Sequence, residues 1–212
     1  RALNLDAAKA RLDFDVKKLD AAIKKNEGLI KKLRMITAEN KDSIMKGIRE
    51  INMSKFVSES VDAVGEANMK GKDIPAAVQI VSMLHLRYTN FASGLSAKLA
   101  GAFAPPKPET LASETDGERK ERLTKRRTAL RLITELLAAG VFTEGALLVT
   151  AVREVISQER AMTDGGATLS ALLVAFTKYA GEDMLGLLPA WRADLEALVE
   201  REQRKALVER EQ

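Results

Sequence analysis

The sequence predicts an all-α fold in which antiparallel helical hairpins stack side by side. Its five prolines fall in three places, at residue 75, between residues 105 and 108, and at residue 189, which leaves long stretches without the residue that breaks helices. Apolar residues recur at spacings of three, four and seven, the period of an amphipathic helix. Aromatic residues make up only 4% of the chain, and this composition suits helix-on-helix packing better than a β-sandwich.

The N-terminal part predicts a long first helix and a shorter second one. An apolar stripe runs through residues 5–33 on a segment otherwise rich in Lys, Asp and Ala, and Gly28 lies inside this stripe. The second helix is expected at residues 42–49. Residues 1–50 should therefore form a helical extension that packs on a helical-repeat domain of residues 51–212.

Three helices are expected in the middle of the chain. Ser54 is placed to cap the first, Asp73 and Pro75 begin the second, and the third covers residues 89–103. The helical period turns these residues inward: Val57, Val61, Val64, Val78, Val81, either Leu84 or Leu86, Phe91, Leu95 and Leu99.

Residues 104–117 differ in composition from the segments around them. They are rich in Pro, Ser and acidic residues and bury too little apolar area to offset the entropy lost on ordering the backbone. We expect a mobile surface loop here.

Four further helices are expected after this loop. The first covers residues 123–137, the second is capped by Thr143, the third begins at Thr168, and the last begins beyond Pro189. Helical pairs recur at intervals somewhat longer than the roughly 40–47 residues of HEAT-type repeats. The short turns between helices make neighbours antiparallel. The predicted architecture is a HEAT-like α-solenoid of antiparallel helical hairpins with a long N-terminal helix.

The chemical inventory argues against catalysis. The chain has no cysteine and a single histidine, His85, which no motif places beside an acid, a serine or a second histidine, so we interpret it as structural. Gly165-Gly166 lacks the lysine and the preceding strand of a phosphate-binding loop. The sequence therefore predicts no enzyme and no catalytic, cofactor-binding or metal site. No apolar run approaches the ~18–20 residues that span a bilayer, so no membrane contact is expected.

The formal net charge of +4 is unevenly distributed. Residues 118–131 hold seven basic against two acidic residues, a net of +5, whereas residues 139–200 hold four basic against nine acidic, a net of −5. The basic run could contact RNA phosphates or an acidic partner helix through these side chains: Arg119, Lys120, Arg122, Lys125, Arg126 and Arg127. The competing interpretation is a solvated helix face, since no aromatic residues accompany the run to stack bases.

Several strings, in order along the chain, carry a family resemblance. They lie at residues 19–36, 53–56, 81–88, 130–137, 140–143 and 181–189. Together they resemble the first middle domain, of the initiation-factor-four-gamma type, in the family of second up-frameshift proteins that regulate nonsense-mediated mRNA decay.

The resemblance implies a HEAT-like stack and a non-enzymatic scaffold role in assembling the mRNA surveillance complex. It implies partners among the surveillance proteins, namely up-frameshift factors and the associated kinase or release-factor complexes, mostly through other domains of a longer chain. It also implies a cytoplasmic location, with perinuclear and some nuclear presence. RNA binding through the basic run at residues 119–127 stays open as the alternative function.

Overall fold

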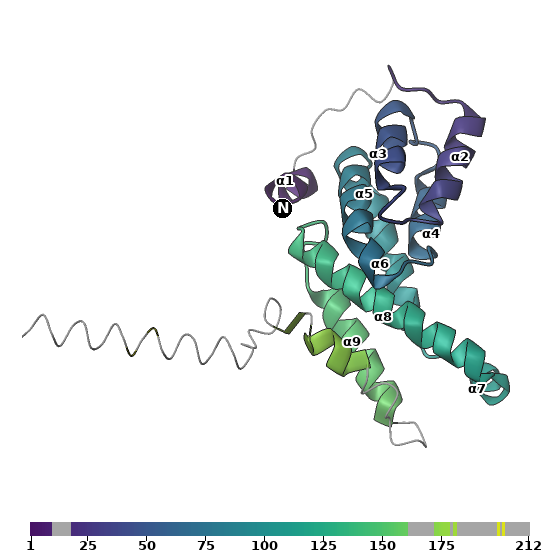
Figure 1. Cartoon of the computed structure of the whole chain (residues 1–212), viewed down its shortest axis with the longest axis vertical. Helices are drawn as coiled ribbons and strands as arrows, with labels where there is room; N and C mark the ends of the chain where they lie inside the picture. Colours follow the sequence, from purple (N-terminus) through teal and green to yellow (C-terminus); the bar gives the residue numbers. More distant parts are fainter. Residues whose placement is uncertain (10–17, 161–171, 179, 182–198, 200, 202–212) are drawn as a thin grey trace, which may run out of the picture. The chain divides into compact units, whose positions relative to one another are not determined.

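The fold was examined in a computed structural model (Figure 1). It describes the following residues: 1–9, 18–160, 172–178, 180, 181, 199 and 201. Over these residues the regular structure is helical, apart from one isolated parallel bridge between Asp20 and Ile51. The predicted all-α class is confirmed. None of the described helices is both long enough and apolar enough to cross a membrane.

The helices described between residues 1 and 160 have these bounds: α1 Ala2–Lys9, α2 Ile23–Leu33, α3 Lys41–Glu50, α4 Val57–Gly65, the 3-10 helix η2 Gly71–Asp73, α5 Ile74–Arg87, α6 Phe91–Gly101, α7 Pro108–Ser113, α8 Asp116–Ala138 and α9 Ala146–Arg160. Residues 172–178 are helical as well. The predicted helix starts at Thr168 and beyond Pro189, like the pair Gly165-Gly166, lie outside the described residues.

The chain divides into two compact units, residues 1–173 and residues 174–212. The predicted boundary after residue 50 does not coincide with this division, because α2 packs on α4 and α3 packs on α5 within the first unit. The N-terminal helices are therefore part of the same stack as the helices that follow them.

The first unit is built of two layers of helices (Figure 1). In one layer α2 packs on α4, α4 on α6, and α6 on α9, and in the other α3 packs on α5 and α5 on α8. Successive helices alternate between the layers, so each hairpin covers the apolar face of the previous one. This is the HEAT-like arrangement that the sequence predicts.

Aliphatic side chains fill the space between the two layers. The fully buried ones include Leu33, Ile36, Ile44, Ile48, Met53, Ile74, Ile80, Leu84, Phe91 and Leu95. Each such burial stabilises the fold by about 1.5–3 kcal/mol relative to an exposed side chain. Among the predicted inward-facing residues of α4 and α5, Val57 and Val78 are only half-buried, and Leu84 rather than Leu86 is in the core.

The prediction of one continuous helix over residues 5–33 is wrong around Asp20. The backbone N–H of Asp20 donates to the Glu50 carbonyl (3.0 Å), and the Asp20 carbonyl accepts from the Asn52 N–H (2.8 Å). The Asp20 carboxylate also accepts the Ala22 N–H at 2.8 Å. These bonds hold the segment before α2 in a non-helical conformation. Short polar side chains such as that of Asp favour this outcome, because they bond nearby backbone N–H groups in competition with the helix. Residues 10–17 lie outside the described part.

Three predicted helix caps differ from the structure, and one of them is Thr143, since α9 begins only at Ala146. α4 begins at Val57 with Phe56 at its cap position, so Ser54 lies two residues before the cap. The Ser54 N–H donates to Asn52 Oδ1 at 3.0 Å in a preceding turn. Asp73 does precede α5, yet its buried carboxylate accepts the N–H groups of Ala38 and Lys70, both at 3.1 Å. Asp73 therefore connects the start of α5 with the backbone at Ala38 and at Lys70.

The buried His85 has a structural role, as expected from its isolation in the sequence. Its Nε2 lies 3.1 Å from the Asn4 carbonyl oxygen, and the Asn4 side chain donates to Ser82 Oγ (3.1 Å) and to the Ala139 carbonyl (2.9 Å). These contacts attach α1 to α5 and to the end of α8. Gly140, at φ +77°, passes so close to α1 that an added Cβ would lie 2.9 Å from Leu5 Cγ.

Candidate interaction site on helix α8

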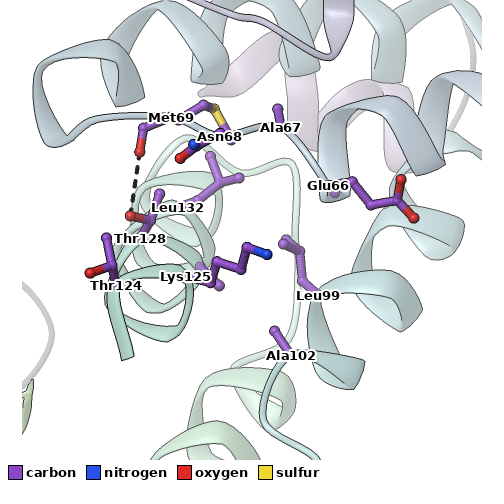
Figure 2. Close-up of a pocket in the computed structure, with 12 residues that line it drawn as sticks. Glu66, Ala67, Asn68, Met69, Leu99, Ala102, Thr124, Lys125, Thr128 and Leu132 are labelled. Carbon is purple, nitrogen blue, oxygen red and sulfur yellow. Dashed lines mark hydrogen bonds between the residues drawn. The ribbon is translucent and has the colours of Figure 1, made fainter. Parts of the chain in front are cut away.

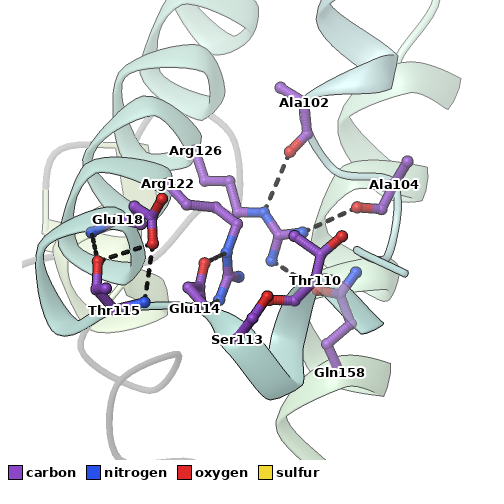
Figure 3. A network of polar contacts seen from close by, with 10 residues as sticks. All are labelled: Ala102, Ala104, Thr110, Ser113, Glu114, Thr115, Glu118, Arg122, Arg126 and Gln158. Atoms are coloured by element: carbon purple, nitrogen blue, oxygen red, sulfur yellow. Dashed lines mark hydrogen bonds and ion pairs between the residues drawn. The ribbon is translucent and has the colours of Figure 1, made fainter. Parts of the chain in front are cut away.

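The basic run predicted to contact a partner lies on α8, whose first turn is fixed by a capping box. The Glu118 N–H donates to Thr115 Oγ1 at 3.3 Å, and the Thr115 N–H donates to Glu118 Oε2 at 2.9 Å (Figure 3). These bonds satisfy two N–H groups that the helix itself leaves unpaired. The Thr115 N–H and the Thr115 hydroxyl, which donates to Glu118 Oε2 at 2.7 Å, hold the pKa of Glu118 below its usual value.

Arg126 points into the protein, with only 1% of its surface exposed. Its guanidinium donates to the carbonyls of Ala102 (3.1 Å) and Ala104 (3.0 Å) and to Gln158 Oε1 of α9 (2.6 Å) (Figure 3). Gln158 in turn donates to the Phe103 carbonyl at 3.0 Å. Burial lowers the pKa of Arg126. The three acceptors replace the hydrogen bonds to water that the buried guanidinium loses. Arg126 therefore joins α6, α8 and α9.

Arg122, one turn earlier, forms a two-bond ion pair with Glu114. Nε and Nη2 of Arg122 each lie 2.6 Å from a different carboxylate oxygen of Glu114, and the side chains are 18% and 11% exposed (Figure 3). The pair holds the pKa of Glu114 below its usual value, chiefly through the hydrogen bond from Arg122. We call Arg122 and Arg126 the inner arginines. Arg126 donates to three acceptors within the protein and Arg122 donates to Glu114, while Arg122 Nη1 is buried without a hydrogen-bond partner over the described residues. Both side chains are therefore largely turned away from the exposed surface on which an RNA or partner contact is expected.

The inner arginines also change the interpretation of residues 104–117. Where composition predicts a mobile loop, the structure has the short helix α7, and the inner arginines bond residues on both sides of it. Phe103, just before this segment, is only 2% exposed. Hydrogen bonds from α8 satisfy backbone and side-chain groups that the segment could not pair by itself.

The other predicted contact residues remain at the surface. Lys120, Lys125 and Arg127 are exposed, and Arg119 is half-buried. Lys125 pairs with Glu121 at 2.8 Å, but both side chains are more than 60% exposed, so the pair restrains Lys125 weakly. The structure therefore places Arg122 and Arg126 on the inward side of α8 and distributes Lys120, Lys125 and Arg127 around its exposed surface.

A small cavity opens beside α8, on the flank that carries Lys125 (Figure 2). Its volume is about 180 Å³, and its apolar walls include Met69, Leu99 and Leu132. Ligand sites for small molecules usually measure roughly 300–1,000 Å³. This cavity is large enough for a side chain but small for a cofactor.

Two participants of this region were missed in the sequence: Glu114 and Gln158. The position of Arg126 did have a signal, since it lies four residues before Leu130 and seven before Ile133, on the apolar face of the predicted helix. A cation at such a position must be paired internally. Its acceptors, in contrast, come from segments 22 to 32 residues away in the chain, which no local pattern could identify.

Comparisons with known proteins agree with this architecture. The MIF4G domain family matches residues 15–178. A crystal structure of the first MIF4G domain of the human nonsense-mediated decay factor UPF2 superposes with a TM-score of 0.74 and 31% sequence identity, covering 89% of this chain and 58% of that one.

Curated relatives are regulators of nonsense transcripts. The chain is 36% identical over 173 residues to the regulator of nonsense transcripts UPF2 of Arabidopsis thaliana, covering 81% of this chain and 14% of the relative. It is 32% identical over 193 residues to the regulator of nonsense transcripts 2 of Homo sapiens, covering 89% of this chain and 14% of that relative. The chain thus spans about a seventh of the length of these proteins.

Proposed function

The chain belongs to the MIF4G domain family, and from that premise we propose that it acts as a non-enzymatic scaffold domain in nonsense-mediated mRNA decay. One observation carries the proposal: 81–89% of the chain is similar to one region of far longer regulators of nonsense transcripts. The match to the first MIF4G domain of human UPF2 supports the same position within such a regulator.

The stacked-helix architecture is suited to a scaffold. A solenoid holds its helices rigidly through contacts between neighbours and presents extended surfaces on both layers. Other surveillance proteins are the partners we propose, namely up-frameshift factors and the kinase or release-factor complexes associated with them. Most of these contacts would be made through other parts of a longer protein. On the same premise we expect a cytoplasmic location with perinuclear and some nuclear presence.

The proposal is tested by removing this domain from the protein in its own cells. We would delete residues 15–178, the family match, and measure the half-life of an mRNA with a premature stop codon against the same mRNA without one. We expect the half-life of the premature-stop mRNA to rise towards that of the normal mRNA, with fewer surveillance proteins co-purifying. Unchanged decay in cells that contain the shortened protein at normal levels would overturn the proposal.

A further inference from the structure

The segment that joins α7 to α8 contains an exposed serine with carboxylates directly after it. Residues 108–118 include four acidic residues and no lysine or arginine. Ser113 is the last residue of α7 and lies one residue before Glu114 and three before Asp116. We propose that Ser113 is phosphorylated by an acid-directed serine kinase, one that recognises carboxylates on the C-terminal side of its acceptor, and that the phosphate then competes with Glu114 for Arg122.

This pattern of carboxylates is confined to one place in the sequence. Among all serines and threonines of the chain, only Ser113 and Thr115 have an acidic residue both one and three positions later. For Ser113 these residues are Glu114 and Asp116. For Thr115 they are Asp116 and Glu118. A kinase with a basic cleft would be directed to this segment, because charge complementarity selects among hydroxyls that are otherwise alike.

The structure distinguishes between these two hydroxyls. Thr115 is held in the capping box, where its hydroxyl accepts the Glu118 N–H at 3.3 Å and donates to the Glu118 carboxylate at 2.7 Å. The carboxylate three positions after Thr115 is therefore engaged with Thr115 itself. Asp116, in contrast, is exposed and has no ion pair over the described residues, so it is available to a kinase. These contacts favour Ser113 as the acceptor.

The Ser113 hydroxyl can be freed at small cost. It donates within α7, to the carbonyls of Glu109 (3.1 Å) and Thr110 (3.4 Å). α7 has only six residues, and helices this short are marginal in water. The backbone after Ser113 is already extended, with φ −66° and ψ 124° at Glu114 and φ −75° and ψ 159° at Thr115. Opening the last turn of α7 thus presents an extended acceptor.

The reaction takes its phosphoryl group from ATP. The Ser113 oxygen forms a bond to the γ-phosphorus, and the hydroxyl proton passes to the catalytic carboxylate of the kinase. The bond between the γ-phosphorus and the oxygen that bridges it to the β-phosphorus breaks, and ADP leaves with that oxygen. The new group carries a charge of about −1.5 to −2 at pH 7 and three strong acceptor oxygens.

Arg122 is placed to receive these oxygens. Its Nε and Nη2 bond Glu114, whereas its Nη1 is buried without a hydrogen-bond partner over the described residues. Figure 3 shows Ser113 on the same side of α8 as Glu114 and Arg122. A phosphate on Ser113 repels the adjacent Glu114 carboxylate and offers an acceptor to the donor that Glu114 leaves unbonded. Besides Arg122, the charges of Arg119 and Arg126 help to lower the pKa of Glu114, so an anion is favoured here.

The test treats the whole protein with casein kinase II, ATP and Mg²⁺ and locates the phosphate by mass spectrometry of its peptides. We expect phosphate at Ser113, and none at this position in Ser113→Ala. Asp116→Asn removes the carboxylate three residues after the acceptor and should slow the reaction at least about fivefold. Thermal unfolding would verify that each variant is folded.

The same segment supplies a matched control. Glu109→Gln removes an exposed carboxylate on the N-terminal side of Ser113, and we expect a rate within about twofold of the parent. Ser43 is exposed on α3 but has no acidic residue among the next six, so it should stay unmodified. Three results would overturn the assignment: phosphate on Thr115 in place of Ser113, equal slowing by Asp116→Asn and Glu109→Gln, or no phosphorylation of the folded protein.

A second measurement tests the competition for Arg122. Prolonged incubation with the kinase modifies both the parent and Glu114→Gln, since Asp116 remains in both. Without phosphate, Glu114→Gln should lower the folding equilibrium constant by about thirtyfold. With phosphate on Ser113, Arg122 has another partner, and the loss should be at most about fivefold. Urea unfolding measures both, and an equal loss with and without phosphate would overturn the competition. The scaffold proposal is tested separately, by mRNA half-life.

Discussion

Arg126 and Arg127 are neighbours in the chain and carry the same charge, yet the fold gives them opposite environments. Arg126 is 1% exposed and donates to two carbonyls and a glutamine, whereas Arg127 projects into solvent. The 100° between successive residues of a helix accounts for the difference. A basic run is therefore not one site: its inner arginines join neighbouring segments of the fold, while Arg127 stays exposed.

The same substitution at Arg126 and at Arg127 tests this difference most directly. Arg126→Met removes the donor for part-buried hydrogen bonds to Ala102, Ala104 and Gln158, and we expect a loss of about 3 kcal/mol in the free energy of unfolding, or roughly 6–12 °C in Tm. Arg127→Met should change it by less than about 0.5 kcal/mol. Urea and thermal unfolding measure both. Equal destabilisation by the two variants would contradict the division of α8 into two faces.

Two of the ion pairs of α8 offer a second comparison. Glu114→Gln removes the charge that Arg122 holds with two bonds, and we expect a loss of about 2 kcal/mol, because charge-assisted bonds in a largely buried pair are strong. Glu121→Gln breaks an exposed pair with Lys125 and should cost less than about 0.5 kcal/mol. Urea unfolding at pH 7 measures both losses of stability. A larger loss for Glu121→Gln would contradict the expectation that the Glu114–Arg122 pair stabilises the fold more than the exposed pair.

The Glu114 pair should also depend on pH. Because Arg122 holds the pKa of Glu114 below its unfolded-state value, the stabilisation is present above the unfolded pKa and disappears as the pH falls through the folded pKa. The stability difference between the parent and Glu114→Gln should be constant from pH 7 to 5 and should shrink below about pH 4. A difference that stays constant to pH 2 would mean that the ionised carboxylate is not responsible.

The two threonines of the first half of α8 give the smallest effect. Thr115→Ala removes the cap that bonds the Glu118 N–H, at an expected cost of about 1 kcal/mol. Thr124→Ala removes only a hydroxyl that bonds the Lys120 carbonyl within the helix, and we expect a change of less than about 0.5 kcal/mol. Equal costs in urea unfolding would show that the capping box does not fix this end of α8.

Residues 104–117 show a difference between the loop predicted from composition and the structure, which has the short helix α7 there. Their Pro, Ser and acidic content predicts little burial, and Pro108, Glu109, Thr110 and Ser113 of α7 are exposed. What orders the segment instead is a set of polar contacts from Arg122 and Arg126. Hydrogen bonds between segments far apart in sequence leave no periodic trace, so hydrophobic patterning could not reveal them.

Asp20 shows the same limit at the N-terminus. The apolar stripe over residues 5–33 continues past Asp20 without a break, which predicts a single helix. The bridge to Ile51 interrupts it, and residue 51 lies beyond the whole predicted extension. Local periodicity identified the apolar face correctly, but a long-range backbone pairing decided where α2 begins.

The sequence by itself determined the helical class, most helix positions and the family resemblance, because helical periodicity, proline placement and ordered motifs are local properties of the chain. Only the tertiary structure decided which cations of α8 are paired with neighbouring segments and how the segment around α7 is held. The physical reason is range: helix formation depends on residues three and four apart, whereas the pairing of a buried charge depends on whatever the fold brings within about 3 Å of it.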